Sequence, residues 1–181
     1  QLDLRWGILS RDVLWRSPKG HTVHLHFERI ASMASVHVLV LRCQVTPMDF
    51  EGEIKVEASF NTEPDNRGVE HWECLQHDGK DNQVWFHMRC LSSKIELSMA
   101  SQLTCSDTAA VVQVTSKDGN PKLTTSFQAT LKQTVTLEKT VTVFTSRDVN
   151  QPLNAAQNLL FSLPSYNTLL AAHGAVWDEL W

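Results

Sequence analysis

The chain has 181 residues, a formal net charge of −4 and 42% hydrophobic residues, which is typical of one globular domain of slightly more than average size. The mild acidity argues against nucleic acid and anionic membranes as partners, because both attract basic surfaces. No run of about 18 apolar residues is present, so no membrane-spanning helix is predicted.

Residues 21–60 predict three strands in succession. In HTVHLHFERI, Val23, Leu25 and Phe27 alternate with polar side chains, which is typical of a half-buried strand. In SVHVLVLRCQVTP both alternating sets are largely apolar, which indicates a central strand covered on both faces. GEIKVEASFN alternates again and predicts a strand with one solvated face.

Residues 61–83 are polar, with a few turn formers and little alternation, and they predict the longest irregular segment. The segments that follow are rich in Val, Thr, Ile and Phe and are separated by short turns. About ten strands without interleaved helices favour a mainly β fold, an antiparallel β-sandwich over residues 1–148.

Residues 149–181 change character and predict helices. AAQNLL predicts a short helix that Pro164 ends, and Ser165 is a suitable N-cap for a second helix. One apolar stripe with helical spacing runs along that second helix and consists of Tyr166, Leu169, Leu170, His173, Val176, Trp177, Leu180 and Trp181.

The end of this second helix is unusual. Asp178 and Glu179 oppose the helix dipole in the last turn, and no C-cap follows. We therefore expect an interrupted linker helix whose stripe, from Leu169 to Trp181, faces a further domain.

The four cysteines, Cys43, Cys74, Cys90 and Cys105, form no CxxC pair. Two disulfides or a metal site would fit this number, but the length of the chain and the lack of a recognisable signal peptide favour buried free thiols in the reducing cytoplasm.

Candidate chemistry is sparse. His24 and His26 lie two residues apart on one strand, close to His21, but no further ligand has diagnostic spacing for a metal. His71, Cys74 and His77 are close in sequence, yet they match no nucleophile motif. We therefore assign no catalytic, metal or cofactor residue.

Two tryptophans are candidates for carbohydrate contact. Trp72 lies in the polar segment and Trp85 opens the next strand, and an aromatic face can stack on a sugar ring. Core packing is the alternative for both side chains.

Four stretches together resemble the N-terminal domain of glycoside hydrolase family 65, which includes maltose, trehalose and kojibiose phosphorylases. They are LDLRWGILSR, FERIASMASVHVLVLRCQVTPMDFEGEIKVEASF, TVTVFTSRD and AAHGAVWDELW, and they span nearly the whole chain. The resemblance implies a galactose-mutarotase-like supersandwich that lacks its first strands here. It also implies a helical linker, residues 149–181, that leads to an (α/α)6 catalytic barrel outside this chain.

The leading hypothesis is therefore a non-catalytic domain of an enzyme that cleaves α-linked disaccharides with phosphate or water. Its implied partners are the catalytic barrel of the same polypeptide, carbohydrate, phosphate and a second subunit in a homodimer. The segment 61–83 is the candidate for reaching the active site. The alternative is a stand-alone carbohydrate-binding module that uses Trp72 or Trp85.

Overall fold

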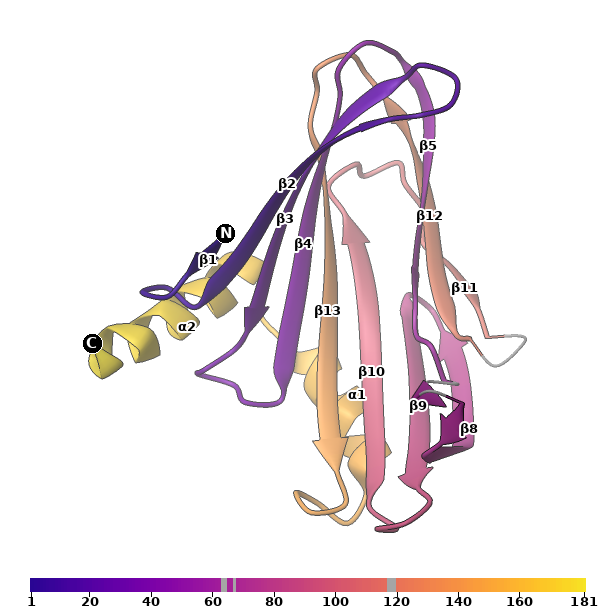
Figure 1. Cartoon of the computed structure of the whole chain (residues 1–181), viewed down its shortest axis with the longest axis vertical. Coiled ribbons are helices and arrows are strands. Elements are labelled where there is room, and N and C mark those ends of the chain that lie inside the picture. The colour runs from indigo at the N-terminus through magenta and orange to yellow at the C-terminus, as the bar shows by residue number, and fades with distance from the viewer. Residues whose placement is uncertain (63–64, 67, 117–119) are drawn as a thin grey trace.

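The computed structural model describes residues 1–62, 65–66, 68–116 and 120–181. These residues form thirteen strands followed by two helices (Figure 1). The strands are β1 (Leu2–Asp3), β2 (Ile8–Arg16), β3 (Thr22–Ala31), β4 (Val38–Pro47), β5 (Gly52–Ser59), β6 (Asp65–Asn66), β7 (Val69–Glu70), β8 (Trp72–Lys80), β9 (Gln83–Cys90), β10 (Glu96–Cys105), β11 (Gln113–Thr115), β12 (Lys122–Ala129) and β13 (Val135–Thr145). The helices are α1 (Pro152–Ser162) and α2 (Tyr166–Leu180).

The strands form one large and two small antiparallel sheets. The large sheet has the order β1-β2-β3-β4-β13-β10-β9-β8, the second sheet has the order β11-β12-β5, and β6 pairs only with β7. The mainly β, antiparallel sandwich fold with C-terminal helices is therefore confirmed.

The main core lies between the large sheet and the three-stranded sheet. Leu123 and Phe127 of β12 point into it, and Phe60 meets Phe86 of β9 edge to face with ring centroids 4.9 Å apart. Because side chains alternate across a strand, this core takes only one face of the large sheet.

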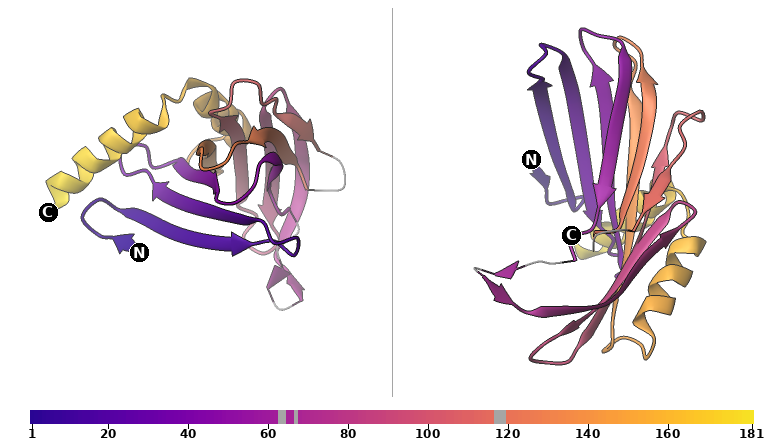
Figure 2. Two further views of the ribbon diagram at one scale, coloured as in Figure 1. Left: turned by 90° about the horizontal axis from the view of Figure 1, so that it is seen from above. Right: turned by 90° about the vertical axis from the view of Figure 1, so that its right-hand side faces the viewer.

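The two helices cover the other face of the large sheet, and Figure 2 shows α1 lying alongside the strands. Ala156 and Leu160 of α1 pack on Ala100 of β10. The hydroxyl of Thr142, on β13, donates a hydrogen bond to the Ala156 carbonyl at 2.7 Å. The large sheet is thus the middle layer of the molecule.

Strand β4 confirms the prediction of a central strand covered on both faces. It lies between β3 and β13. Val38 and Val40 face α2, whereas Cys43 and Val45 belong to the core between the sheets. Strand β5 also matches its prediction, because exposed and half-buried residues alternate along its whole length.

The prediction that residues 61–83 are irregular is wrong for most of the segment. Trp72–Lys80 is a nine-residue strand that pairs with β9, and β6 and β7 form a small hairpin before it. Residues 63–64 and 67 lie outside the described part. The sequence pattern missed β8 because this strand is at the edge of the sheet, and a register shift between Cys74 and Gln76 interrupts its alternation.

Replacement of Leu160 by alanine tests the helix layer. Leu160 is 1% exposed, whereas its neighbour Phe161 is 86% exposed. Leu160→Ala should lower the free energy of unfolding by about 2–5 kcal/mol, because it leaves a cavity between α1 and the sheet. The matched control Phe161→Ala should change it by less than about 0.5 kcal/mol. Urea denaturation measures both, and equal effects would contradict this packing.

Candidate functional site

Helix α2 begins at the predicted N-cap. The backbone N–H of Thr168 donates to the Ser165 hydroxyl, at 3.4 Å. The cap places Tyr166 and Leu169 toward the large sheet, where both are buried against Ile30 of β3 and two valines of β4. The first half of the apolar stripe therefore packs within this chain.

Tyr166 also joins a polar network on that face of the sheet. Its hydroxyl donates to Glu28 Oε2 at 3.1 Å, and the Arg42 guanidinium lies 4.1 Å from the centroid of its ring. Arg42 continues to Glu138 on β13 through a 3.1 Å ion pair. Burial, together with the Glu28 carboxylate, raises the pKa of Tyr166, so the phenol stays protonated and remains a donor.

His173 connects α2 to two segments that are remote in sequence. Its ring is 1% exposed. Nδ1 accepts a hydrogen bond from the Met33 N–H at 3.0 Å, which leaves Nε2–H to donate to the Trp6 carbonyl at 2.9 Å. Both ring nitrogens are therefore paired in one neutral tautomer, and the helix is held against the turn before β2.

Two glycines allow that turn to approach α2 closely. A Cβ on Gly174 would lie 2.9 Å from the ring of Trp6, and a Cβ on Gly7 would overlap the Trp177 indole. Gly7 also has a φ of +62°, which other residues rarely adopt. Trp6 and Trp177 thus interlock with the opposing backbone.

The C-terminal end of α2 remains uncovered. Leu180 and Trp181 are 61% and 73% exposed, and Leu4 and Trp6 beside them are also exposed. Trp181 Nε1 donates to the Leu4 carbonyl at 3.2 Å, and the two termini lie on one side of the molecule (Figure 1). We call these four side chains, Leu4, Trp6, Leu180 and Trp181, the terminal patch.

The residues of the predicted linker face therefore differ in burial along α2. Leu169 and His173 are buried, Leu170, Val176 and Trp177 are half-buried, and only Leu180 and Trp181 are exposed. Sequence reasoning missed the partner of this face, the turn with Trp6 and Gly7. The glycine in LRWGIL was the one available signal, and its partners are more than 160 residues away in sequence.

The two tryptophans proposed for carbohydrate contact are half-buried in packed clusters. Trp72 packs against the core between the sheets. Trp85 packs in the cluster beneath α1, and its Nε1 is buried. Their contact with carbohydrate remains a prediction.

The histidines considered as metal ligands form hydrogen bonds within the sheet. His24 and His26 both bond to Asp12 Oδ1, at 3.1 and 2.9 Å, on the exposed side of β2 and β3. Within the described part of the chain, no group of three or more His, Cys, Asp or Glu could hold a metal ion. No helix among the described residues is long and apolar enough to cross a membrane.

The four cysteines are free thiols in this structure. The prediction that they are buried is wrong, because Cys74 is exposed and Cys43, Cys90 and Cys105 are half-buried. Cys74 lies on the edge strand β8, which has no neighbour on its outer side among the described strands.

The fold defines a class of protein: a mainly β, antiparallel sandwich domain followed by two helices, the second of which ends in exposed apolar side chains. The family "Glycosyl hydrolase family 65, N-terminal domain" matches residues 1–180, and the chain belongs to this family.

Similar proteins agree with this assignment. Kojibiose phosphorylase of Halothermothrix orenii is 23% identical, and the match covers 99% of this chain and 25% of that protein. Nigerose phosphorylase of Lachnoclostridium phytofermentans is 27% identical over 99% of this chain and 27% of its own length. The solved structure "Putative kojibiose phosphorylase from human microbiome" superposes with a TM-score of 0.80 at 16% identity, covering 98% of this chain and 24% of that one. The chain thus spans about a quarter of the length of these curated relatives.

A double-mutant cycle tests the contact between Trp6 and α2. Gly174→Ala should destabilise the native chain, because the new methyl group meets the Trp6 ring. In a Trp6→Ala background the same change should stabilise by about 1 kcal/mol, the usual gain for alanine over glycine inside a helix. Thermal unfolding of the four proteins gives the coupling, and the same sign in both backgrounds would contradict the contact.

Proposed function

We propose that residues 1–181 are a non-catalytic domain of a longer enzyme that cleaves an α-linked disaccharide, and that the terminal patch contacts the catalytic part of that enzyme. The observation that supports this contact is the difference in burial between the two halves of α2. Its first half is buried on the sheet, whereas Leu180 and Trp181 continue the same apolar stripe into solvent. Exposed apolar patches of this kind mark interaction surfaces.

The relatives support the reaction class. The two curated relatives described above are phosphorylases of disaccharides, and about three quarters of their length lies outside the match. The whole enzyme would transfer a glycosyl group from the disaccharide to phosphate, so that the glycosidic bond breaks and a sugar 1-phosphate and a free sugar form. The helical segment from residue 149 onward would connect the sandwich to the catalytic part.

The activity test compares residues 1–181 with the longer natural polypeptide. Only the longer polypeptide should release sugar 1-phosphate from kojibiose, nigerose, maltose or trehalose in the presence of phosphate. Release by residues 1–181 alone would contradict the proposed role. If the longer polypeptide releases free sugars without phosphate, the reaction is hydrolysis and not phosphorolysis.

Substitution in the terminal patch tests the contact separately. Trp181→Ala should lower the melting temperature of the longer polypeptide by several degrees, because Trp and Tyr are typical anchors of interfaces. In residues 1–181 alone the change should be near zero, since the side chain is mostly exposed. Phe161→Ala, which truncates an even more exposed aromatic residue on α1, is the control and should leave both proteins unchanged. Equal effects of Trp181→Ala in the two proteins would exclude the patch as the contact.

A further inference from the structure

A histidine, His173, lies in the apolar stripe of α2. It is 1% exposed, and Leu169 and Trp177 lie one helical turn before and after it. An apolar side chain would fill the same space without the cost of burying two polar nitrogens. The hydrogen bonds of the ring therefore account for a histidine at this position.

The ring of His173 bridges two segments that approach α2 from different parts of the chain. Met33 lies in the loop between β3 and β4, and its N–H donates to Nδ1 at 3.0 Å. The Ser32 N–H donates to the Val38 carbonyl at 2.9 Å and closes this loop, and Val38 is itself buried against α2. On its other side the ring donates from Nε2 to the Trp6 carbonyl, in the turn formed by residues 4–7. We call His173 with these two hydrogen bonds the latch.

The latch accommodates only the neutral ring. The Met33 N–H requires the lone pair of Nδ1, so a proton on this nitrogen would set two N–H groups against each other. A charged ring at a buried position would also lose its hydration. Among the described residues no carboxylate forms an ion pair with this ring.

Several charged or ionisable side chains lie on the segments that surround the latch. They are Asp3, Arg5, Glu28, Arg29, His37, Arg42, Asp178 and Glu179. Asp3 accepts hydrogen bonds from two backbone N–H groups of the turn, and Glu28 accepts one from Tyr166. None of these groups bonds to the His173 ring, so none compensates a charge on it directly.

A protonated ring can regain water only if a covering segment moves. The turn lies directly over the ring, since a Cβ on Gly7 would be 2.9 Å from Nε2. The turn is joined to the sheet through the two-residue strand β1, whereas the loop with Met33 connects two ten-residue strands of the sheet. The turn is therefore the segment that we expect to move.

The terminal patch depends on the position of this turn. Leu4 and Trp6 of the patch lie on the turn, whereas Leu180 and Trp181 lie at the end of α2. The buried bond from His173 to Trp6 and the exposed bond from Trp181 to Leu4 connect the two halves. A hydrogen bond in contact with water holds two segments together only weakly. Loss of the buried bond would therefore separate the halves of the patch.

We propose that His173 is a proton-sensitive latch, which in its neutral form holds the turn with Trp6 against α2 and on protonation releases it. Histidine is the side chain whose charge ordinarily changes between about pH 5 and about pH 8, so moderate acidification would operate the latch. The latch itself requires only residues 1–181. Its effect on the catalytic part, through the terminal patch, rests on the proposed function.

The direction of the pH effect follows from proton linkage. The open form takes up a proton that the closed form excludes, so opening becomes more favourable as the pH falls. For a free imidazole that titrates near pH 6.5, a change from about pH 7.5 to about pH 5.5 raises the equilibrium constant for opening about tenfold.

Amide hydrogen exchange of Met33 tests the latch in residues 1–181 with isotope-labelled methionine. Its protection factor, which is corrected for the intrinsic exchange rate at each pH, should fall about tenfold between these two pH values. Met99 lies on β10, which is paired on both sides, and reports global unfolding. Met33 should exchange faster than Met99 at both pH values, because the latch opens locally. Equal protection of the two amides, or protection of Met33 that does not change with pH, would overturn the proposal.

Substitution of the histidine assigns the pH effect to its ring. His173→Gln retains a donor for the Trp6 carbonyl but cannot titrate, and His173→Asn instead retains an acceptor close to the position of Nδ1. In either variant the protection of Met33 should be lower at the higher pH and should not change on acidification. The control His71→Gln removes an exposed histidine and should keep the tenfold fall. A tenfold fall in the His173 variants would contradict the latch.

The longer polypeptide tests the effect on the terminal patch. The loss in melting temperature caused by Trp181→Ala measures the contact with the catalytic part, and it should be smaller at the lower pH because the patch is then open. In a His173→Gln background the loss should be the same at both pH values. A loss that is independent of pH with His173 present would overturn the effect on the patch. Absence of any loss at the higher pH would overturn the proposed contact instead, and the exchange of Met33 would still decide on the latch.

Discussion

The large sheet has to bury apolar side chains on both of its faces, and the other elements are arranged around this requirement. Val40 and Cys43 on β4 point to opposite sides, and both sides have a covering layer. The three-stranded sheet packs on one face and the helices on the other, as in other layered domains. The hydroxyl of Thr142 binds a carbonyl of α1 from within the sheet, so the layers are joined by a directional contact as well as by apolar burial.

The two halves of helix α2 have different surroundings. Its first half, from Tyr166 to His173, is part of the layer that covers the sheet, and His173 fixes it to the turn before β2. Its second half ends in exposed tryptophan and leucine. In the function proposed above, the anchored first half would set the direction in which the exposed apolar end meets the catalytic part of the longer polypeptide.

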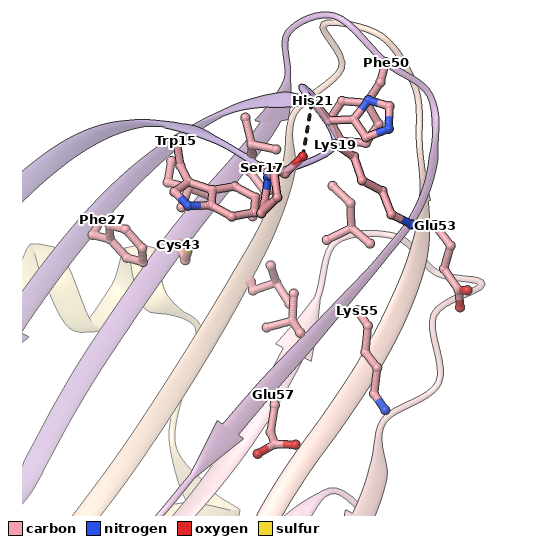
Figure 3. Close-up of a pocket in the computed structure, with 17 residues that line it drawn as sticks. Trp15, Ser17, Lys19, His21, Phe27, Cys43, Phe50, Glu53, Lys55 and Glu57 are labelled. Carbon is pink, nitrogen blue, oxygen red and sulfur yellow. Dashed lines mark hydrogen bonds between the residues drawn. The ribbon is translucent and has the colours of Figure 1, made fainter.

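The layer formed by the three-stranded sheet does not extend over all of β2, β3 and β4. The second sheet ends at β5, opposite an apolar face that continues beyond it (Figure 3). Lys139 on that face donates a hydrogen bond to the Ser59 carbonyl and lies over the Phe60 ring.

Local patterns in the sequence were sufficient for the strands with regular alternation, such as β3, β4 and β5, and for the proline break and the serine cap before α2. These features depend on neighbouring residues only, so they are visible without tertiary information. Local patterns failed for β8, which lies at a sheet edge and contains a bulge. The order of strands, the division of the α2 stripe and the interlocking of Trp6 with Gly174 were decided by the tertiary structure. Each of these joins residues that are far apart in the chain, and the sequence indicates which side chains are apolar but not which surface will cover them.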